Sequence, residues 1–375
     1  MSSRIQNPSA LPDTLWFTRC PVPTATGIAA DQGWLAREFA ADGIAVRSLQ
    51  DAPPEVAADH HYTHALTGLF REGGNVPALW ARSRGEATRL IGLTWIEERQ
   101  VVLVRAGSGI TGPEQLRGLR LAVPHHDIGI DFWRAMALAG FRGALGLAGL
   151  TLADAEPVDV PGIPGGGQWS AELAALRDGT VDAVYVKGAL AVEAARRIGA
   201  EVAVELDAAP DRRSRVNNGT PRPITVHQRL LDEQPELVAR FLAVLLESAD
   251  WAAEHPEEVV RILRAETGAG TEGVAGAYAP GSHRTLHLDL SGERLELLAL
   301  QERFLREQGF LAAPVDVQAW VDPEPLRAAR ELLRVRRSGA GAGAGGGGGR
   351  GRGAGGGAGE GAGVGVGGVQ ITDFS

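Results

Sequence analysis

The sequence predicts an α/β protein with two lobes around a central cleft. Between residues 14 and 206, short apolar runs typical of strands alternate with segments of helical spacing, a pattern that produces sheets covered by helices. Extended segments at residues 100–106 and 221–226 interrupt the alternation, and we expect the chain to cross between the lobes there. One large doubly wound sheet is the alternative architecture.

Two crossings would place both ends of the chain in one lobe and its middle in the other. We therefore expect residues 12–104 and 222–336 to form the first lobe and residues 105–221 the second. Residues 337–375 form a tail rich in Gly and Ala. Such a segment buries too little apolar surface to offset its ordering entropy, so we expect this tail to be disordered.

The individual elements follow from periodicity and from stop signals. The apolar run at residues 14–20 predicts the first strand, and residues 31–43 have helical spacing that ends at Gly43. The same reasoning predicts strands at 44–49, 87–96 and 100–106, a short helix leading into a strand across 111–124, a helix–strand–helix–strand succession across 169–206, and long helices at 235–255 and 293–310.

Composition narrows the function classes. The formal net charge is -9, which argues against nucleic acid as a partner. No run of about 18 apolar residues is present, so we expect no membrane span. The N-terminus has no basic stretch followed by an apolar run, and the chain holds a single cysteine, so we expect a cytoplasmic protein.

The single cysteine, Cys20, follows the first predicted strand. Ligands of open α/β sheets bind outside the carboxyl ends of the strands, and Pro21 and Pro23 stop this strand and stiffen the chain that leaves it. A catalytic thiol at the mouth of a cleft is one interpretation. A small buried hydrophobic residue is the other.

A second unusual segment, residues 59–80, contains three of the nine histidines within five residues. His60, His61, His64 and Asp59 are possible metal ligands. Tyr62 and Thr63 favour an extended or irregular run, which would not gather those side chains on one face. A polar loop without a special role is a further reading.

Anion binding is the third interpretation of this segment. Arg71 offers a two-pronged guanidinium to an oxyanion. Gly73 and Gly74 would let backbone N–H groups approach the same oxyanion closely. We expect the intervening Glu72 to point outward, because an inward carboxylate would repel the anion.

Taken together, these residues resemble the family of aromatic sulfinate desulfinases that act in dibenzothiophene desulfurisation. The string Cys20-Pro21-Val22-Pro23 matches the family's motif after its first strand, and His61 precedes Arg71 by the family's ten residues. The resemblance extends over residues 12–335 and is faintest in the middle lobe. The family carries an aromatic residue at the position of His64.

The resemblance implies the two-lobed fold of type II periplasmic binding proteins, with mixed sheets covered by helices around a central cleft. It implies a hydrolase that cleaves the carbon–sulfur bond of a sulfinate and releases sulfite, with no metal and no organic cofactor. Cys20 would be the nucleophile or the proton donor, His61 would assist it, and Arg71 with the Gly73 amide would hold the sulfinate. We add Gly74, Tyr62 and Lys187 as substrate-binding residues and expect a monomer whose partner is a small anionic sulfinate.

A binding protein is the rival class. Solute-binding proteins for sulfonates, nitrate and thiamine precursors share these strand and helix patterns, and a non-catalytic relative would bind a small anion without cleaving it. An enzyme of thiamine-pyrimidine synthesis is a third class. Trp16, Trp133 and Trp169 are candidates for stacking on an aromatic substrate, residues 125–127 for lining the second lobe, and residues 217–219 for a turn.

Overall fold

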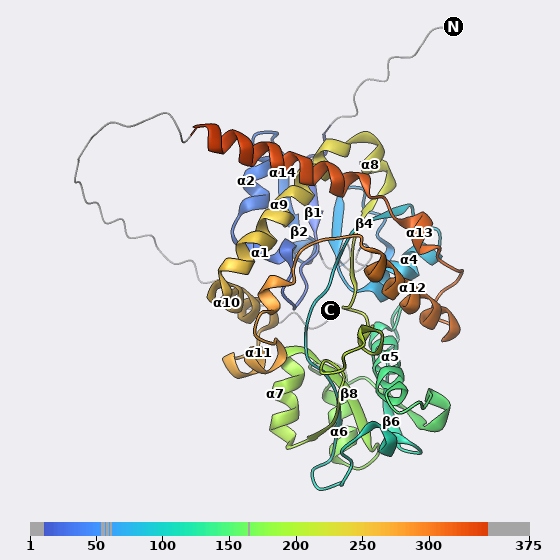
Figure 1. Ribbon diagram of the computed structural model, residues 1–375. Helices are drawn as coiled ribbons and strands as arrows, with labels where there is room; N and C mark the ends of the chain where they lie inside the picture. Colours follow the sequence, from blue (N-terminus) through green and yellow to red (C-terminus); the bar gives the residue numbers. More distant parts are fainter. Residues whose placement is uncertain (1–10, 54–56, 58–59, 61, 164–165, 344–375) are drawn as a thin grey trace, which may run out of the picture.

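The computed structural model describes residues 11–343 apart from 54–56, 58–59, 61 and 164–165. It consists of two lobes, each built around a five-stranded sheet (Figure 1). The strand orders are β2-β1-β3-β10-β4 in the first lobe and β7-β6-β8-β5-β9 in the second. The two-lobed α/β fold expected from the sequence is therefore present.

The first sheet brings distant parts of the chain to one edge. β1 (Thr14–Phe17) pairs in parallel with β2 (Ala45–Ser48) and β3 (Leu69–Glu72). β10 (Arg222–His227) runs antiparallel to both β3 and β4 (Thr88–Thr94). Because of this reversal, β10 begins at the edge where β1, β3 and β4 end.

The second sheet has a similar arrangement. β5 (Gln100–Val104) runs antiparallel to both of its neighbours, β8 (Ala183–Lys187) and β9 (Glu201–Glu205). β6 (Arg120–His125) pairs in parallel with β7 (Glu156–Pro161) and β8. Gln100 pairs with Lys187, so the end of β8 lies beside the point where the chain enters this lobe.

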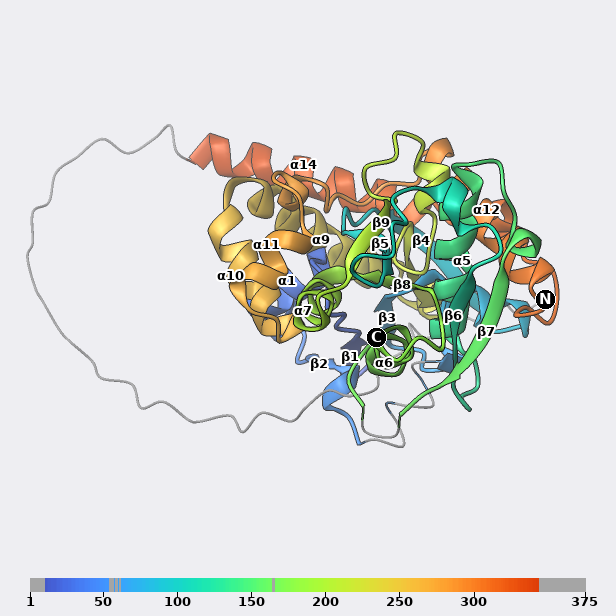
Figure 2. The ribbon, with the colours of Figure 1, turned by 90° about the horizontal axis from the view of Figure 1, so that it is seen from below.

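Helices cover both sheets (Figures 1 and 2). In the first lobe α9 packs against α14, α1 and α2, and in the second lobe α5 packs against β5, β6 and β8. The helices of eight residues or more are α4 (Asn75–Ser83), α5 (Phe132–Gly146), α6 (Ser170–Arg177), α7 (Gly188–Ile198), α9 (Pro235–Glu254), α10 (Pro256–Thr267), α12 (Gly292–Glu307) and α14 (Glu324–Gly343). The shorter ones are α1 (Ala25–Asp31), α2 (Trp34–Ala40), α8 (Gln228–Glu233), α11 (Thr271–Ala277) and α13 (Val317–Trp320). Among the described helices, none combines the length and the hydropathy that a membrane span requires.

Three expectations about the limits of the lobes need correction. Residues 222–226, where we expected the second crossover, belong to a strand, β10, of the first sheet. Residues 100–104 are likewise not a crossover in the first lobe but a strand, β5, of the second sheet. All five of its residues are buried, as is typical of a strand covered by helices on both faces. The expected disordered tail at 337–375 also begins too early, because α14 continues to residue 343; residues 344–375 lie outside the described ranges.

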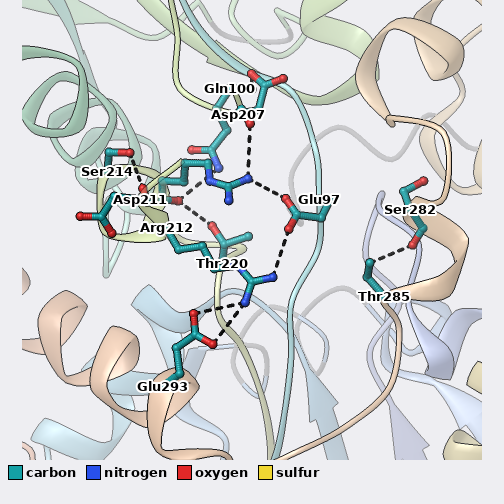
Figure 3. Close-up of polar contacts among 11 residues, drawn as sticks. Glu97, Gln100, Asp207, Asp211, Arg212, Ser214, Thr220, Ser282, Thr285 and Glu293 are labelled. Carbon is teal, nitrogen blue, oxygen red and sulfur yellow. Dashed lines mark hydrogen bonds and ion pairs between the residues drawn. The ribbon is translucent and has the colours of Figure 1, made fainter. Parts of the chain in front are cut away.

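The chain crosses between the lobes at residues 95–99 and 206–221, and charged side chains join these two crossovers. Glu97 accepts a hydrogen bond from Arg215 Nη1 at 2.8 Å and forms an ion pair with Arg212 Nη2 at 3.7 Å. Arg212 also reaches Glu293 on α12 at 3.3 Å (Figure 3). Both guanidinium groups lie over the ring of Trp95, at 5.1 and 5.9 Å from its centroid. This cluster connects both crossovers to the first lobe.

Candidate active site

A cavity that opens to solvent lies between the two lobes, where the ends of the two sheets meet the crossovers. Both lobes and both crossovers contribute to its wall. The residues that line it are Cys20, Pro21, Val22, Arg71, Gly74, Pro77, Glu98, Trp133, Met136, Gln168, Trp169, Lys187, Gly188, Ala189, Leu190, Asn218, Arg222 and Thr267.

Cys20 lies in this wall three residues after the end of β1, as its position in the sequence predicts. Its side chain is buried, and the thiol donates a hydrogen bond to the carbonyl oxygen of Glu72 at 3.3 Å. The hydroxyl of Thr18 donates to the same carbonyl at 3.1 Å. The thiol is therefore held against the end of β3, next to the arginine that precedes Glu72.

Arg71 is almost completely buried, with 1% of its surface exposed. Its Nη1 donates to the carbonyl oxygen of Gly74 at 3.0 Å, while its Nε has no hydrogen-bond partner in the described part of the chain. Burial lowers the pKa of Arg71 to about 10, and the nearby charge of Arg222 adds to this, whereas a charge on Cys20 would oppose it. At neutral pH Arg71 is therefore a buried cation with unused donor capacity.

The two glycines after Glu72 are explained by close packing. A Cβ on Gly73 would lie 2.4 Å from Arg71 Nη1, and a Cβ on Gly74 would lie 2.3 Å from Asn218 Oδ1. The Gly73 N–H donates to the carbonyl of Pro223 at 3.3 Å, so this amide takes part in the sheet instead of pointing freely into the cavity. Gly73 is needed for the position of the guanidinium, and Gly74 lines the cavity.

Glu72 does not point outward as we expected from the sequence. Only 1% of its surface is exposed, and its carboxylate accepts hydrogen bonds from the N–H and hydroxyl of Thr26, at 3.1 and 2.6 Å, and from the hydroxyl of Thr94 at 3.0 Å. Successive strand residues point to opposite faces, which separates this carboxylate from the Arg71 side chain. It ties α1 to the end of β4.

The histidine segment differs from the expected extended run. Tyr62 and Thr63 are helical, whereas His61 lies outside the described residues. His64 is buried with a positive φ of 56°. Tyr62 is near enough to Arg71 for its charge to affect the pKa of the arginine. In the described ranges no group of three His, Cys, Asp or Glu side chains is arranged to hold a metal ion.

The second lobe contributes a lysine and two tryptophans. Lys187 lines the cavity and forms an ion pair with Glu98 on the first crossover. Trp133 and Trp169 line it too, in an edge-to-face arrangement with ring centroids 5.2 Å apart. Trp16, by contrast, lies in β1 and is not among the lining residues.

The lining residues that sequence reasoning missed as parts of the site include Glu98, Asn218 and Arg222. Asn218 belongs to the expected turn, where Thr220 N donates to the Asn217 carbonyl at 3.0 Å. The Asn218 side chain accepts a hydrogen bond from the Val76 N–H at 2.9 Å and so joins this turn to α4. The expected role for residues 125–127 has no support among the lining residues; His126 instead contacts Asp131.

Comparisons with known proteins agree with the fold. The model of the NMT1/THI5-like family matches residues 24–259, more than half of the chain, and the chain belongs to that family. It is also 28% identical to the 2'-hydroxybiphenyl-2-sulfinate desulfinases of Rhodococcus erythropolis and Rhodococcus qingshengii, over 86% of this chain and 97% of each relative.

Solved structures of known proteins share the fold of this chain. A crystal structure of a mutant of the desulfurization enzyme DszB in complex with biphenyl-2-sulfinic acid matches with a TM-score of 0.68 and 25% identity, over 86% of this chain and 100% of the other. The periplasmic aliphatic sulphonate binding protein SsuA of Escherichia coli matches with a TM-score of 0.63 and 17% identity, over 84% and 93%. The second likeness concerns the fold alone.

Proposed function

We propose that this protein is a hydrolase that cleaves the carbon–sulfur bond of an aromatic sulfinate and releases sulfite. The observation that carries the proposal is the position of the Cys20 thiol and the buried Arg71 cation in one cavity between the lobes. The similarity to sulfinate desulfinases over 86% of the chain supports the same reaction.

The reaction needs water as its only co-reactant. The carbon–sulfur bond breaks, the carbon gains a proton, and the sulfur gains the oxygen of water, so an aryl sulfinate and water give an arene and hydrogen sulfite. The overall change requires neither an oxidant nor a reductant, and we propose that it proceeds without a metal or an organic cofactor.

Arg71 is proposed to bind the sulfinate oxygens with the donors that it does not use in the protein. An anion there would supply acceptors for a buried guanidinium, and such charge-assisted hydrogen bonds are stronger than neutral ones. Cys20, on the adjacent strand end, would either protonate the departing carbon or attack the sulfur, with His61 assisting it. Gly74, Tyr62 and Lys187 are proposed to bind the substrate further, and Trp133 and Trp169 offer apolar surface to its ring.

We also propose that the protein acts as a monomer in the cytoplasm. A reducing compartment would keep the single free thiol available for chemistry.

A ligand-binding protein is the second candidate, favoured by the likeness in fold to the sulphonate-binding protein. Measuring sulfite release separates the two. Purified protein is given 2'-hydroxybiphenyl-2-sulfinate and a panel of aryl and alkyl sulfinates, with the Cys20→Ser variant as control. Sulfite that depends on Cys20 supports the hydrolase, while thermal stabilisation by one of these sulfinates without any sulfite would identify a binding protein.

A further inference from the structure

A second guanidinium group, that of Arg222, lies in the cavity wall. The reaction proposed for Cys20 and Arg71 gives it no role. Arg222 is the first residue of β10 and has 4% of its surface exposed. Its Nε and Nη1 are buried and have no hydrogen-bond partner in the described part of the chain. Leaving a buried donor without an acceptor is destabilising, and more so for a charged group.

Three charged groups meet at Gly219, in the turn before β10. A Cβ placed on Gly219 would lie 3.1 Å from Glu98 Oε1, 3.1 Å from Lys187 Nζ and 3.4 Å from Arg222 Nη2. All three side chains line the cavity. We refer to Glu98, Lys187 and Arg222 as the Gly219 cluster.

Within this cluster Glu98 has a charged partner, whereas Arg222 has none among the residues that the structure describes. Glu98 is ion-paired with Lys187, and their side chains are 2% and 12% exposed. No ion pair within 4.0 Å joins Arg222 to an acidic side chain among the described residues. The nearby Glu72 is held by Thr26 and Thr94 and does not line the cavity.

The net charge of the cavity wall also indicates a second anionic group in the ligand. Its lining side chains include three cations, Arg71, Lys187 and Arg222, and one carboxylate, Glu98. A single sulfinate held by Arg71 balances one of the two excess positive charges. The Arg71 guanidinium lies against Gly73 and donates to the Gly74 carbonyl, whereas the Arg222 guanidinium lies against Gly219. The two cations are near enough for the charge of Arg222 to lower the pKa of Arg71, so a second anionic group beside the sulfinate would relieve their repulsion.

We propose that the Gly219 cluster is a second anion subsite, and that the substrate is a sulfinate carrying an additional carboxylate, which Arg222 binds. This inference rests on the proposed function, because it assigns the sulfinate to Arg71. A carboxylate would give Arg222 the planar, two-pronged partner that guanidinium groups bind well. The preferred substrate is therefore a dianion.

The test compares benzenesulfinate with its 2-, 3- and 4-carboxy derivatives. Dissociation constants are measured calorimetrically on Cys20→Ser protein, which removes turnover from the binding measurement, and sulfite release is measured on the protein with its cysteine. We expect at least one carboxylated isomer to bind about tenfold more tightly than benzenesulfinate. If no isomer is preferred, the subsite proposal is wrong.

Variants of Arg222 assign the preference to a residue. In the Cys20→Ser background, Arg222→Met should weaken binding of the preferred isomer about tenfold while benzenesulfinate changes by less than about threefold. Arg222→Lys, which keeps the charge, should restore part of the preference and covers the case in which the methionine variant does not fold. Removing the exposed Arg47 on β2 as Arg47→Met should change neither ligand.

Two results would overturn the assignment in different ways. An equal loss for both ligands in Arg222→Met would mean that Arg222 holds the sulfinate itself. A retained carboxylate preference would mean that another group binds it. If carboxylated sulfinates bind as expected but no sulfite is released from any of them, the subsite is supported and the proposed hydrolase activity is the part that fails.

Discussion

The guanidinium of Arg71 lies directly against Gly73, so closely that a Cβ at that glycine would be 2.4 Å from Nη1, 2.6 Å from Cζ and 2.9 Å from Nη2. Distances below 3.0 Å force one partner to move. The glycine therefore determines where the positive charge of the cavity lies.

Gly73→Ala should displace the Arg71 guanidinium and weaken sulfinate binding about tenfold, with a smaller effect on the turnover number. Michaelis constants from sulfite release test this. Gly146→Ala is the matched control, because nothing lies within 4 Å of a Cβ at Gly146 in α5. Equal Michaelis constants for Gly73→Ala and the unmodified protein would show that Arg71 does not position the anion.

Cys20→Ser should abolish turnover while sulfinate binding stays within about threefold, because the hydroxyl can make the same hydrogen bond to the Glu72 carbonyl but is a weaker acid and nucleophile. Single-turnover sulfite assays and calorimetry measure the two effects separately. Full activity in this variant would exclude the thiol from the chemistry.

Sulfinate binding should depend on pH through Arg71. Its pKa of about 10 means that the guanidinium is charged at pH 7 to 9 and loses its proton as the pH rises through 10. Affinity should therefore be constant across pH 7 to 9 and fall by up to about tenfold for each further pH unit above 10. The measurement uses Cys20→Ser protein, so that the thiol does not contribute, with circular dichroism to verify folding. Arg71→Ala should bind weakly with no such decline, and a decline of equal size in that variant would assign it to another group.

The cluster around Glu97 predicts a stability effect remote from the chemistry. Glu97→Gln weakens its contacts with Arg215 and Arg212 and should lower the free energy of unfolding by about 1–2 kcal/mol. Glu293→Gln removes only an exposed contact to Arg212 and should cost less than about 0.5 kcal/mol. Urea denaturation of both variants compares them directly; equal losses would show that the link between the crossovers adds little.

The parts of the fold that the sequence predicts are those with a clear period or stop signal. The first strand is an apolar run that prolines end, and this stop signal also predicted that Cys20 lies at the end of the strand. β3 was missed because two of its four residues are charged, although all four are buried. α5 was missed because most of its residues are buried, so apolar residues surround the helix and no polar face reveals the helical period.

The residues of the candidate site likewise fall into two groups: those that a local sequence motif predicts and those that it does not. Arg71 and its glycines form a motif that can be read from adjacent residues. Glu98 and Arg222 each stand alone in a crossover or at a strand start, and nothing nearby shows that they are buried. Arg222 is buried where β10 pairs with β3 and β4, and Glu98 is buried where it pairs with Lys187 of the second lobe. Both are tertiary contacts that neighbouring residues in the sequence do not reveal.

The place of β10 between β3 and β4 has a consequence for biosynthesis. Until residue 227 has left the ribosome, the first sheet exists only as two separate pieces, and the facing edges of β3 and β4 are open to other strands. The second sheet is complete earlier, because its last strand ends at residue 205. The lobe encoded in the middle of the chain can therefore fold first, and the lobe that holds Cys20 and Arg71 is completed afterwards, when the late-made strand enters between two early ones.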